Sequence, residues 1–179
     1  MKVILVSIMI LIATTIVSAN DISLNVERIT LLTPPVNDLS TESSRIALFF
    51  EIPDSLDSRH IVYAEIVTEL DLSYLDIEGI STIELEAFNI ISDWNEGDSW
   101  NSLADNIDTL SFYSYTFETG DDSQVFMDIT PFIKGITAGD NANFGLMLIP
   151  NKLDQIAFQI NEGTLVQLRN NAKIKIVFQ

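Results

Sequence analysis

The most unusual local segment of the chain is residues 94–101, WNEGDSWN, which holds both tryptophans. Carboxylates and amides lie between the two indole rings. One interpretation is a sugar-binding site, in which an aromatic ring covers the apolar face of a sugar and polar groups bond its hydroxyls. The other is that a tryptophan anchors the edge of the core and donates its N–H to a polar partner. The candidate ligand-binding residues here are Trp94, Glu96, Asp98 and Trp100.

A second aromatic segment, residues 111–117, reads SFYSYTF. If it is a β-strand, Tyr113, Tyr115 and Phe117 share one face, because side chains alternate between the two faces of a strand. A row of exposed aromatic rings would be a binding platform, since a large apolar patch on a protein surface marks an interaction site. The same face would equally serve as part of the core if it packs inward. Tyr113 and Tyr115 are therefore candidate ligand-binding residues with a structural alternative.

Three acidic residues make a candidate metal site. Asp121 and Asp122 are adjacent, and Asp128 follows them in the chain. Calcium takes its oxygen ligands mostly from carboxylates and carbonyls, so a structural Ca²⁺ ion is one interpretation. A solvated acidic turn is the other, because the spacing of an EF-hand loop is not present. Acidic residues are abundant in this part of the chain: between Glu51 and Asp128 the only basic side chain is Arg59.

Composition excludes several kinds of chemistry. The 179 residues contain no cysteine and one histidine, which removes thiol nucleophiles, cysteine zinc sites and paired-histidine metal motifs. A Ser-His-Asp arrangement would have to use His60, and no G-x-S-x-G motif accompanies it. With 26 acidic against 9 basic residues and a net charge of −17, the protein is not expected to bind nucleic acid. No carboxylate pair is singled out for glycoside hydrolysis, so we expect no enzyme activity.

The N-terminal residues 1–19 are typical of a secretory signal peptide. Lys2 precedes an apolar run, and Val17 and Ala19 occupy positions −3 and −1 of a cleavage site after Ala19. The apolar run is shorter than the roughly 20 residues of a spanning helix, so we expect cleavage rather than a membrane anchor. No cysteine is present to carry lipid. The sequence therefore predicts a secreted protein, extracellular or at the cell surface, without a membrane span after cleavage.

The elements that must position these residues are mostly strands. Apolar and polar residues alternate over strand-length segments, and Gly, Pro, Asn and Asp clusters separate the segments. This pattern predicts an all-β, antiparallel domain, either a sandwich or a barrel. One short helix is expected over residues 128–136, with Thr130 as N-cap and Pro131 at the first helical position, and residues 99–105 can form a looser turn. The expected strands cover residues 22–29, 45–51, 60–70, 82–90, 124–129, 143–149, 155–160 and 172–178.

Residues 20–179 are expected to form a single domain, since no linker, repeat or low-complexity tract interrupts them. Residues 20–44 supply an N-terminal strand and a proline-containing loop, and residues 45–179 the rest. The N-terminal strand can pair within its own sheet or with the sheet of a neighbouring molecule.

The order of motifs in residues 45–178 resembles the DNRLRE-domain family. These are secreted β-sandwich modules related to disaggregatase repeats and to jelly-roll carbohydrate-binding modules. Residues 46–53 and 63–66 are similar to the two early strands of that family. The other matched motifs are W-x-E-x-x-x-W-N at Trp94, Glu96, Trp100 and Asn101, D-[VI]-T at Asp128, Ile129 and Thr130, and N-[YF]-G-[LF] at Asn143, Phe144, Gly145 and Leu146.

The resemblance implies a jelly-roll β-sandwich that binds carbohydrate without catalysis, at a cell surface or in an extracellular matrix. The strong negative charge favours neutral over anionic polysaccharides as partners, unless calcium bridges the two. The alternative is a structural subunit of a surface fibre or biofilm matrix, which assembles with itself or with another surface protein.

Overall fold

The computed structural model describes residues 19–35, 43–57, 59–69, 82–118, 124–151 and 162–179. The predicted signal peptide up to residue 18, the predicted strand at 155–160, and Asp121 and Asp122 lie outside the described residues. Among the described helices, none has the length and apolar character needed to cross a membrane.

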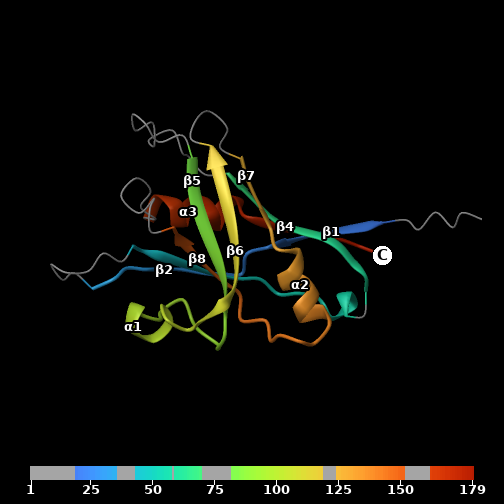
Figure 1. The fold of residues 1–179 in the computed structure, drawn as a ribbon, viewed down its shortest axis with the longest axis horizontal. Coiled ribbons are helices and arrows are strands. Elements are labelled where there is room, and N and C mark those ends of the chain that lie inside the picture. Colours follow the sequence, from blue (N-terminus) through green and yellow to red (C-terminus); the bar gives the residue numbers. More distant parts are fainter. Residues whose placement is uncertain (1–18, 36–42, 58, 70–81, 119–123, 152–161) are drawn as a thin grey trace, which may run out of the picture.

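The described chain forms two antiparallel β-sheets, which confirms the all-β sandwich (Figure 1). The four-stranded sheet has the order β1-β9-β4-β7, and the five-stranded sheet has the order β2-β3-β8-β5-β6. The first sheet comprises β1 (Asn20–Asn25), β9 (Lys173–Phe178), β4 (Ile61–Glu69) and β7 (Gln124–Asp128). The second comprises β2 (Arg28–Leu32), β3 (Arg45–Phe49), β8 (Leu146–Pro150), β5 (Thr82–Ile90) and β6 (Ile107–Glu118).

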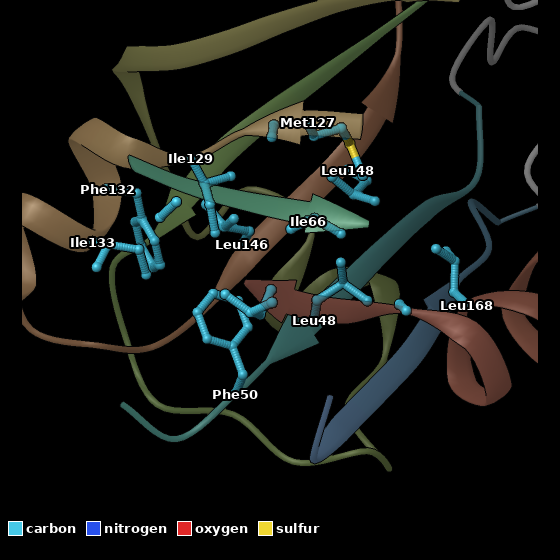
Figure 2. Packing of buried hydrophobic residues seen from close by; sticks show 14 of the residues in the cluster. Leu48, Phe50, Ile66, Met127, Ile129, Phe132, Ile133, Leu146, Leu148 and Leu168 are labelled. Atoms are coloured by element: carbon cyan, nitrogen blue, oxygen red, sulfur yellow. The ribbon is translucent and has the colours of Figure 1, made fainter. Parts of the chain in front are cut away.

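The main core lies between the two sheets. Figure 2 shows Ile66 and Met127 from the four-stranded sheet packed toward Leu48 and Leu148 from the five-stranded sheet. All four side chains are buried, while the intervening positions of β4 and β7 are more exposed. This alternation follows from the pleat of a strand, which sends successive side chains to opposite faces. The inward residues therefore hold the sheets together, and the outward residues of β4 and β7 remain available for other contacts.

The described chain contains three α-helices rather than the one that was predicted: α1 (Trp100–Leu103), α2 (Thr130–Thr137) and α3 (Glu162–Asn171). A 3₁₀-helix also covers Asp54–Leu56. Helix α3 was missed because much of it is exposed and it carries no strong apolar stripe; burial of Thr164 and Leu168 against the core stabilises it.

Helix α2 confirms the predicted helix, with a correction at its start. The N-cap is Ile129, and Thr130 is the first helical residue. The Thr130 hydroxyl accepts a 2.8 Å hydrogen bond from the Ala64 backbone N–H of β4, so it does not cap its own helix. Instead, Asp128 Oδ1 accepts a 2.8 Å hydrogen bond from the Thr130 N–H. The ring of Phe132 packs edge-on against the ring of Phe50, with 5.8 Å between the two ring centroids.

The predicted strand at residues 22–29 is two strands in different sheets. Strand β1 pairs with β9, and β2 pairs with β3. The N-terminal segment therefore pairs within its own domain. Leu24 and Ile29 are five residues apart, so the alternation changes phase between them, and the two residues contribute apolar side chains to the same inter-sheet core from opposite sheets.

Candidate functional site

Trp94 is part of a second hydrophobic cluster, on the side of the five-stranded sheet that faces away from the main core. Only 1% of its surface is exposed, and its Nε1–H donates a 2.7 Å hydrogen bond to the Phe144 carbonyl. Ala47 and Met147 lie in the same cluster. Because the ring of Trp94 is buried and its N–H has a partner, the structure favours the core-anchor interpretation of this residue over sugar stacking.

The polar residues after Trp94 also make contacts within the protein. Glu96 Oε1 accepts hydrogen bonds from the Ile29 N–H at 3.1 Å and from Arg169 Nη2 at 3.4 Å. Asp98 Oδ2 accepts a 2.7 Å hydrogen bond from the Asn95 N–H and closes a local turn. Glu96 therefore binds the segment of residues 94–101 to the outer edge of β2 and to α3. In this structure the contacts of Glu96 and Asp98 support the fold.

Trp100 begins α1 and remains half-buried. The Arg45 guanidinium lies 4.6 Å from the centre of a Trp100 ring, at a distance typical of a cation–π contact. Arg45 also donates a hydrogen bond to the Ala104 carbonyl and lies 3.6 Å from Asp105 Oδ1. The two tryptophans thus do not form a common exposed surface.

Tyr113 and Tyr115 lie on the inward side of β6. They pair across the sheet with Ala87 and Leu85, which are buried in the main core, and both tyrosines pack against that core. The Tyr115 hydroxyl donates a hydrogen bond to the Asp128 carbonyl, which joins β6 to β7 across the sandwich edge. Burial raises the pKa of both phenols. An exposed platform on this face, predicted as one of two possibilities, is not formed.

Of the three predicted metal ligands, only Asp128 is described. Its Oδ1 atom accepts the Thr130 N–H, as a residue before a helix commonly does. Among the described residues, no group of three or more potential ligands is placed to hold a metal ion. Asp128 alone does not make a calcium site, and the calcium prediction rests on its partners outside the described residues.

The structure brings together a different set of side chains, which we name the four-strand outer face. These are the outward residues of three adjacent strands in the four-stranded sheet. Their cross-strand partners put Glu65 opposite Asp128 and Lys175, and Val67 opposite Phe126 and Lys173. The four-strand outer face comprises Tyr63, Glu65 and Val67 of β4, Phe126 and Asp128 of β7, and Lys173 and Lys175 of β9.

Two exposed aromatic rings lie on the four-strand outer face. Tyr63 is 37% exposed and Phe126 is 52% exposed. The Tyr63 hydroxyl donates a 2.8 Å hydrogen bond to Glu65 Oε2, which orients both side chains. An aromatic ring beside a carboxylate offers a ligand an apolar surface and a hydrogen-bond acceptor within one contact area.

The lysines give the same face hydrogen-bond donors. Within the described part of the chain, the salt bridges are all made by arginines, so the exposed Lys173 and Lys175 keep their ammonium groups in solvent. Glu65 lies on the adjacent strand β4, and Asp128 lies on β7, on the far side of β4. The four-strand outer face therefore combines donors, acceptors and apolar rings, whereas the chain as a whole is strongly acidic.

The phenol of Tyr63 is expected to stay protonated through the neutral and mildly alkaline range. Burial, the hydrogen bond to Glu65 and the negative charges of Glu65 and Asp128 raise its pKa from 10.0 to about 12. Because the folded state holds this proton more tightly, the stability it contributes is complete below pH 10 and is lost as the pH rises through about 12.

This shift can be measured as the difference between ultraviolet titrations of the wild-type protein and Tyr63→Phe. The tyrosinate signal that the wild type shows and Tyr63→Phe lacks should have its midpoint near pH 12. The free energy of unfolding of Tyr63→Phe should also fall less between pH 10 and 12 than that of the wild type. A missing signal centred near pH 10 would contradict the contact with Glu65.

Sequence reasoning missed the four-strand outer face although its signal was present. Residues 63, 65 and 67 alternate with apolar residues, as do Lys173 and Lys175. Alternation shows that one face of each strand is exposed to solvent. Only the pairing of the strands shows that these exposed faces lie next to one another.

No protein-family model matches this chain, and no curated protein matches it. The resemblance to the DNRLRE-domain family therefore stays a prediction that rests on the residues quoted for it.

Proposed function

We propose that the protein is a secreted, non-catalytic module that binds a neutral glycan on the four-strand outer face, at a cell surface or in an extracellular matrix. The observation that carries this proposal is the placement of Tyr63 and Phe126 at opposite ends of a polar strip. Glu65, Asp128 and Lys175 lie in the row between them.

The spacing suits an extended sugar chain. Tyr63 and Val67 are four residues apart on β4, and Phe126 pairs with Val67 on the next strand. Strand geometry therefore sets the Cα atoms of the two aromatic residues about 14 Å apart. Several sugar units span such a distance, so two rings of one chain can stack while the hydroxyls between them meet carboxylates and an ammonium group. The site would thus bind the interior of a chain rather than a single sugar.

The connections between strands support a jelly-roll type for the sandwich. The chain crosses from one sheet to the other between β1 and β2, β3 and β4, β4 and β5, β6 and β7, β7 and β8, and β8 and β9. Repeated crossing between two facing sheets is typical of jelly rolls.

The matched DNRLRE motifs act as scaffold in this interpretation. Trp94 of one motif donates to the Phe144 carbonyl of another, and Asn143 donates a 2.8 Å hydrogen bond to the Phe50 carbonyl. Such contacts between separate motifs support a shared fold more directly than a shared ligand.

Charge favours a neutral ligand. The net charge of −17 repels anionic polysaccharides at long range, and the two lysines of the four-strand outer face are accompanied by Glu65 and Asp128.

We also propose that Asp121, Asp122 and Asp128 bind a structural Ca²⁺ ion, and that the protein is secreted after cleavage following Ala19.

Binding can be tested with soluble neutral oligosaccharides such as cellohexaose, xylohexaose and mannohexaose. We expect Tyr63→Ala and Phe126→Ala each to weaken binding of the preferred oligosaccharide about tenfold in calorimetric titrations, which corresponds to about 1.4 kcal/mol of lost stacking. Leu110→Ala is the matched control, because Leu110 is 92% exposed on β6 in the other sheet and should bind as the wild type does.

Equal affinity of all three variants would exclude the four-strand outer face as the binding site. A loss of binding in Trp100→Ala alone would instead move the site to the segment of residues 94–101.

The alternative function is a structural subunit of a surface fibre or matrix. Strands β1 and β2 both pair within the chain, so they are not donated to a neighbour. The edge of the four-stranded sheet at β1 nevertheless favours contact with another molecule.

A further inference from the structure

The described sheets have four edge strands, and three of them either contact residues outside their own sheet or pair irregularly. At β2, Glu96 accepts the Ile29 N–H, and the Thr30 hydroxyl donates a 2.9 Å hydrogen bond to the Glu96 carbonyl. Strands β6 and β7 are joined by the hydrogen bond from Tyr115 to the Asp128 carbonyl. The pairing of β6 with β5 also shifts in register beyond Phe88. Covered or irregular edges of this kind prevent pairing with other chains.

Strand β1 lacks these protections among the described residues. Its pairing with β9 runs without a register shift from Asn20 opposite Phe178 to Asn25 opposite Lys173. Among the described strands, β9 is its only partner in the four-stranded sheet, and no described residue covers the other side of β1. The six residues NDISLN contain no lysine or proline, the residue types that most often protect an edge strand from pairing, and Asp21 is their only charged residue. Its backbone N–H and C=O groups on that side are therefore available to a further strand.

The side chains of β1 are suited to an identical partner. Ile22 and Leu24 face the core but stay half-buried at its margin. Asp21, Ser23 and Asn25 point to the outer face and are exposed. A partner strand that supplies apolar residues on one face and small polar residues on the other would complete both faces.

We propose that β1 pairs antiparallel with β1 of a second copy of this chain, across a two-fold axis at Ser23. In this register Ser23 faces its own counterpart. Ile22 lies opposite Leu24 of the second copy, which extends the burial of both, and Asp21 lies opposite Asn25, which can donate to the carboxylate. An isologous contact of this kind closes after two copies and leaves no open edge at the joint.

The contact joins two four-stranded sheets into one sheet of eight strands, with both four-strand outer faces on the same side. A pairing of two six-residue strands is smaller than a standard stable interface, so the dimer should form only as the concentration rises. If the proposed function holds, a long glycan could contact both faces at once and bind with higher avidity. The dimer itself does not depend on that function.

A single cysteine provides the first test, because the chain has none of its own. In Ser23→Cys, the two thiols would face each other across the axis, within about 5.5 Å between Cβ atoms, which is near disulfide range. Under mild oxidation we expect the purified Ser23→Cys protein to form a covalent dimer at least tenfold faster than Thr109→Cys. Thr109 is exposed on β6 and is the matched control. Equal rates for the two variants would overturn the proposal.

The oligomeric state provides an independent test. Sedimentation equilibrium of the wild-type protein should show an average mass that rises with concentration. Ser23→Lys places two like charges opposite each other and should weaken self-association at least tenfold, whereas Thr109→Lys should leave it unchanged. A wild-type protein that stays monomeric at millimolar concentration would overturn the proposal, whatever glycan it binds, and loss of glycan binding would leave it standing.

Discussion

Replacing Gly145 with alanine is expected to destabilise the protein by about 3 to 5 kcal/mol, because two costs add. Gly145 has a φ of +91°, a conformation that L-residues rarely adopt. A Cβ atom at this position would also lie 2.0 Å from the Leu48 carbonyl oxygen and 3.2 Å from the Phe49 Cα. Those atoms belong to the backbone of β3, which pairs with β8 directly after Gly145, so they cannot move aside without breaking the sheet.

Two other glycines separate these costs. Gly139 has a φ of +79°, but a Cβ atom added there would meet no atom within 4 Å, so Gly139→Ala should cost only about 1 kcal/mol from the backbone conformation. Gly97 has open space and no positive φ, so Gly97→Ala should stay within about 0.5 kcal/mol of the wild type. Urea unfolding followed by tryptophan fluorescence measures all three. A cost for Gly145→Ala no larger than that for Gly139→Ala would contradict the close approach to Leu48.

Trp94→Ala is expected to lower the free energy of unfolding by about 3 to 5 kcal/mol, because a large buried side chain is removed from a packed cluster. Trp94→Phe should lose about half as much. It keeps most of the apolar contact but leaves the Phe144 carbonyl without the indole donor. Trp100→Phe is the comparison on the same segment, and its half-buried ring predicts a loss of about 1 kcal/mol.

The Trp94 variants also test the location of the ligand site. If glycan binds to the four-strand outer face, the folded Trp94→Phe protein should keep the oligosaccharide affinity of the wild type. A loss of affinity in Trp94→Phe without a matching loss at Tyr63→Ala would return the site to the segment of residues 94–101. Stability and binding therefore have to be measured on the same preparations.

Much of the strand content could be predicted because polar residues on the solvent-exposed face of a strand contrast with apolar residues on its buried face. Residues 82–90 were expected as a strand and form β5 with those bounds, and the helix at residues 128–136 forms as α2. Where this contrast was weak, prediction failed. Helix α3 has no strong apolar stripe, and in residues 22–29 the break between β1 and β2 is marked only by a change of phase between Val26 and Ile29.

The candidate site was harder to predict than the fold. Trp94, Tyr113 and Tyr115 were conspicuous as residue types, but conspicuous aromatic side chains serve cores as well as surfaces. The neighbours of each ring decide which, and those neighbours are distant in the chain: Phe144 for Trp94, and Asp128 for Tyr115. Composition and spacing contain no information on such contacts.

By itself, the amino-acid sequence determined the class of this protein: an acidic, cysteine-free chain of alternating strands with one recognisable helix start. Alternation and turn residues are local properties, so they can be read without knowing what lies nearby. Only the tertiary structure decided which solvent-exposed strand faces lie side by side, which aromatic rings are buried, and which described edge strand has no partner on its outer side. Strand pairing joins residues far apart in the chain, such as Tyr63 of β4 with Val177 of β9, and the packing of the two sheets depends on all of these pairings together.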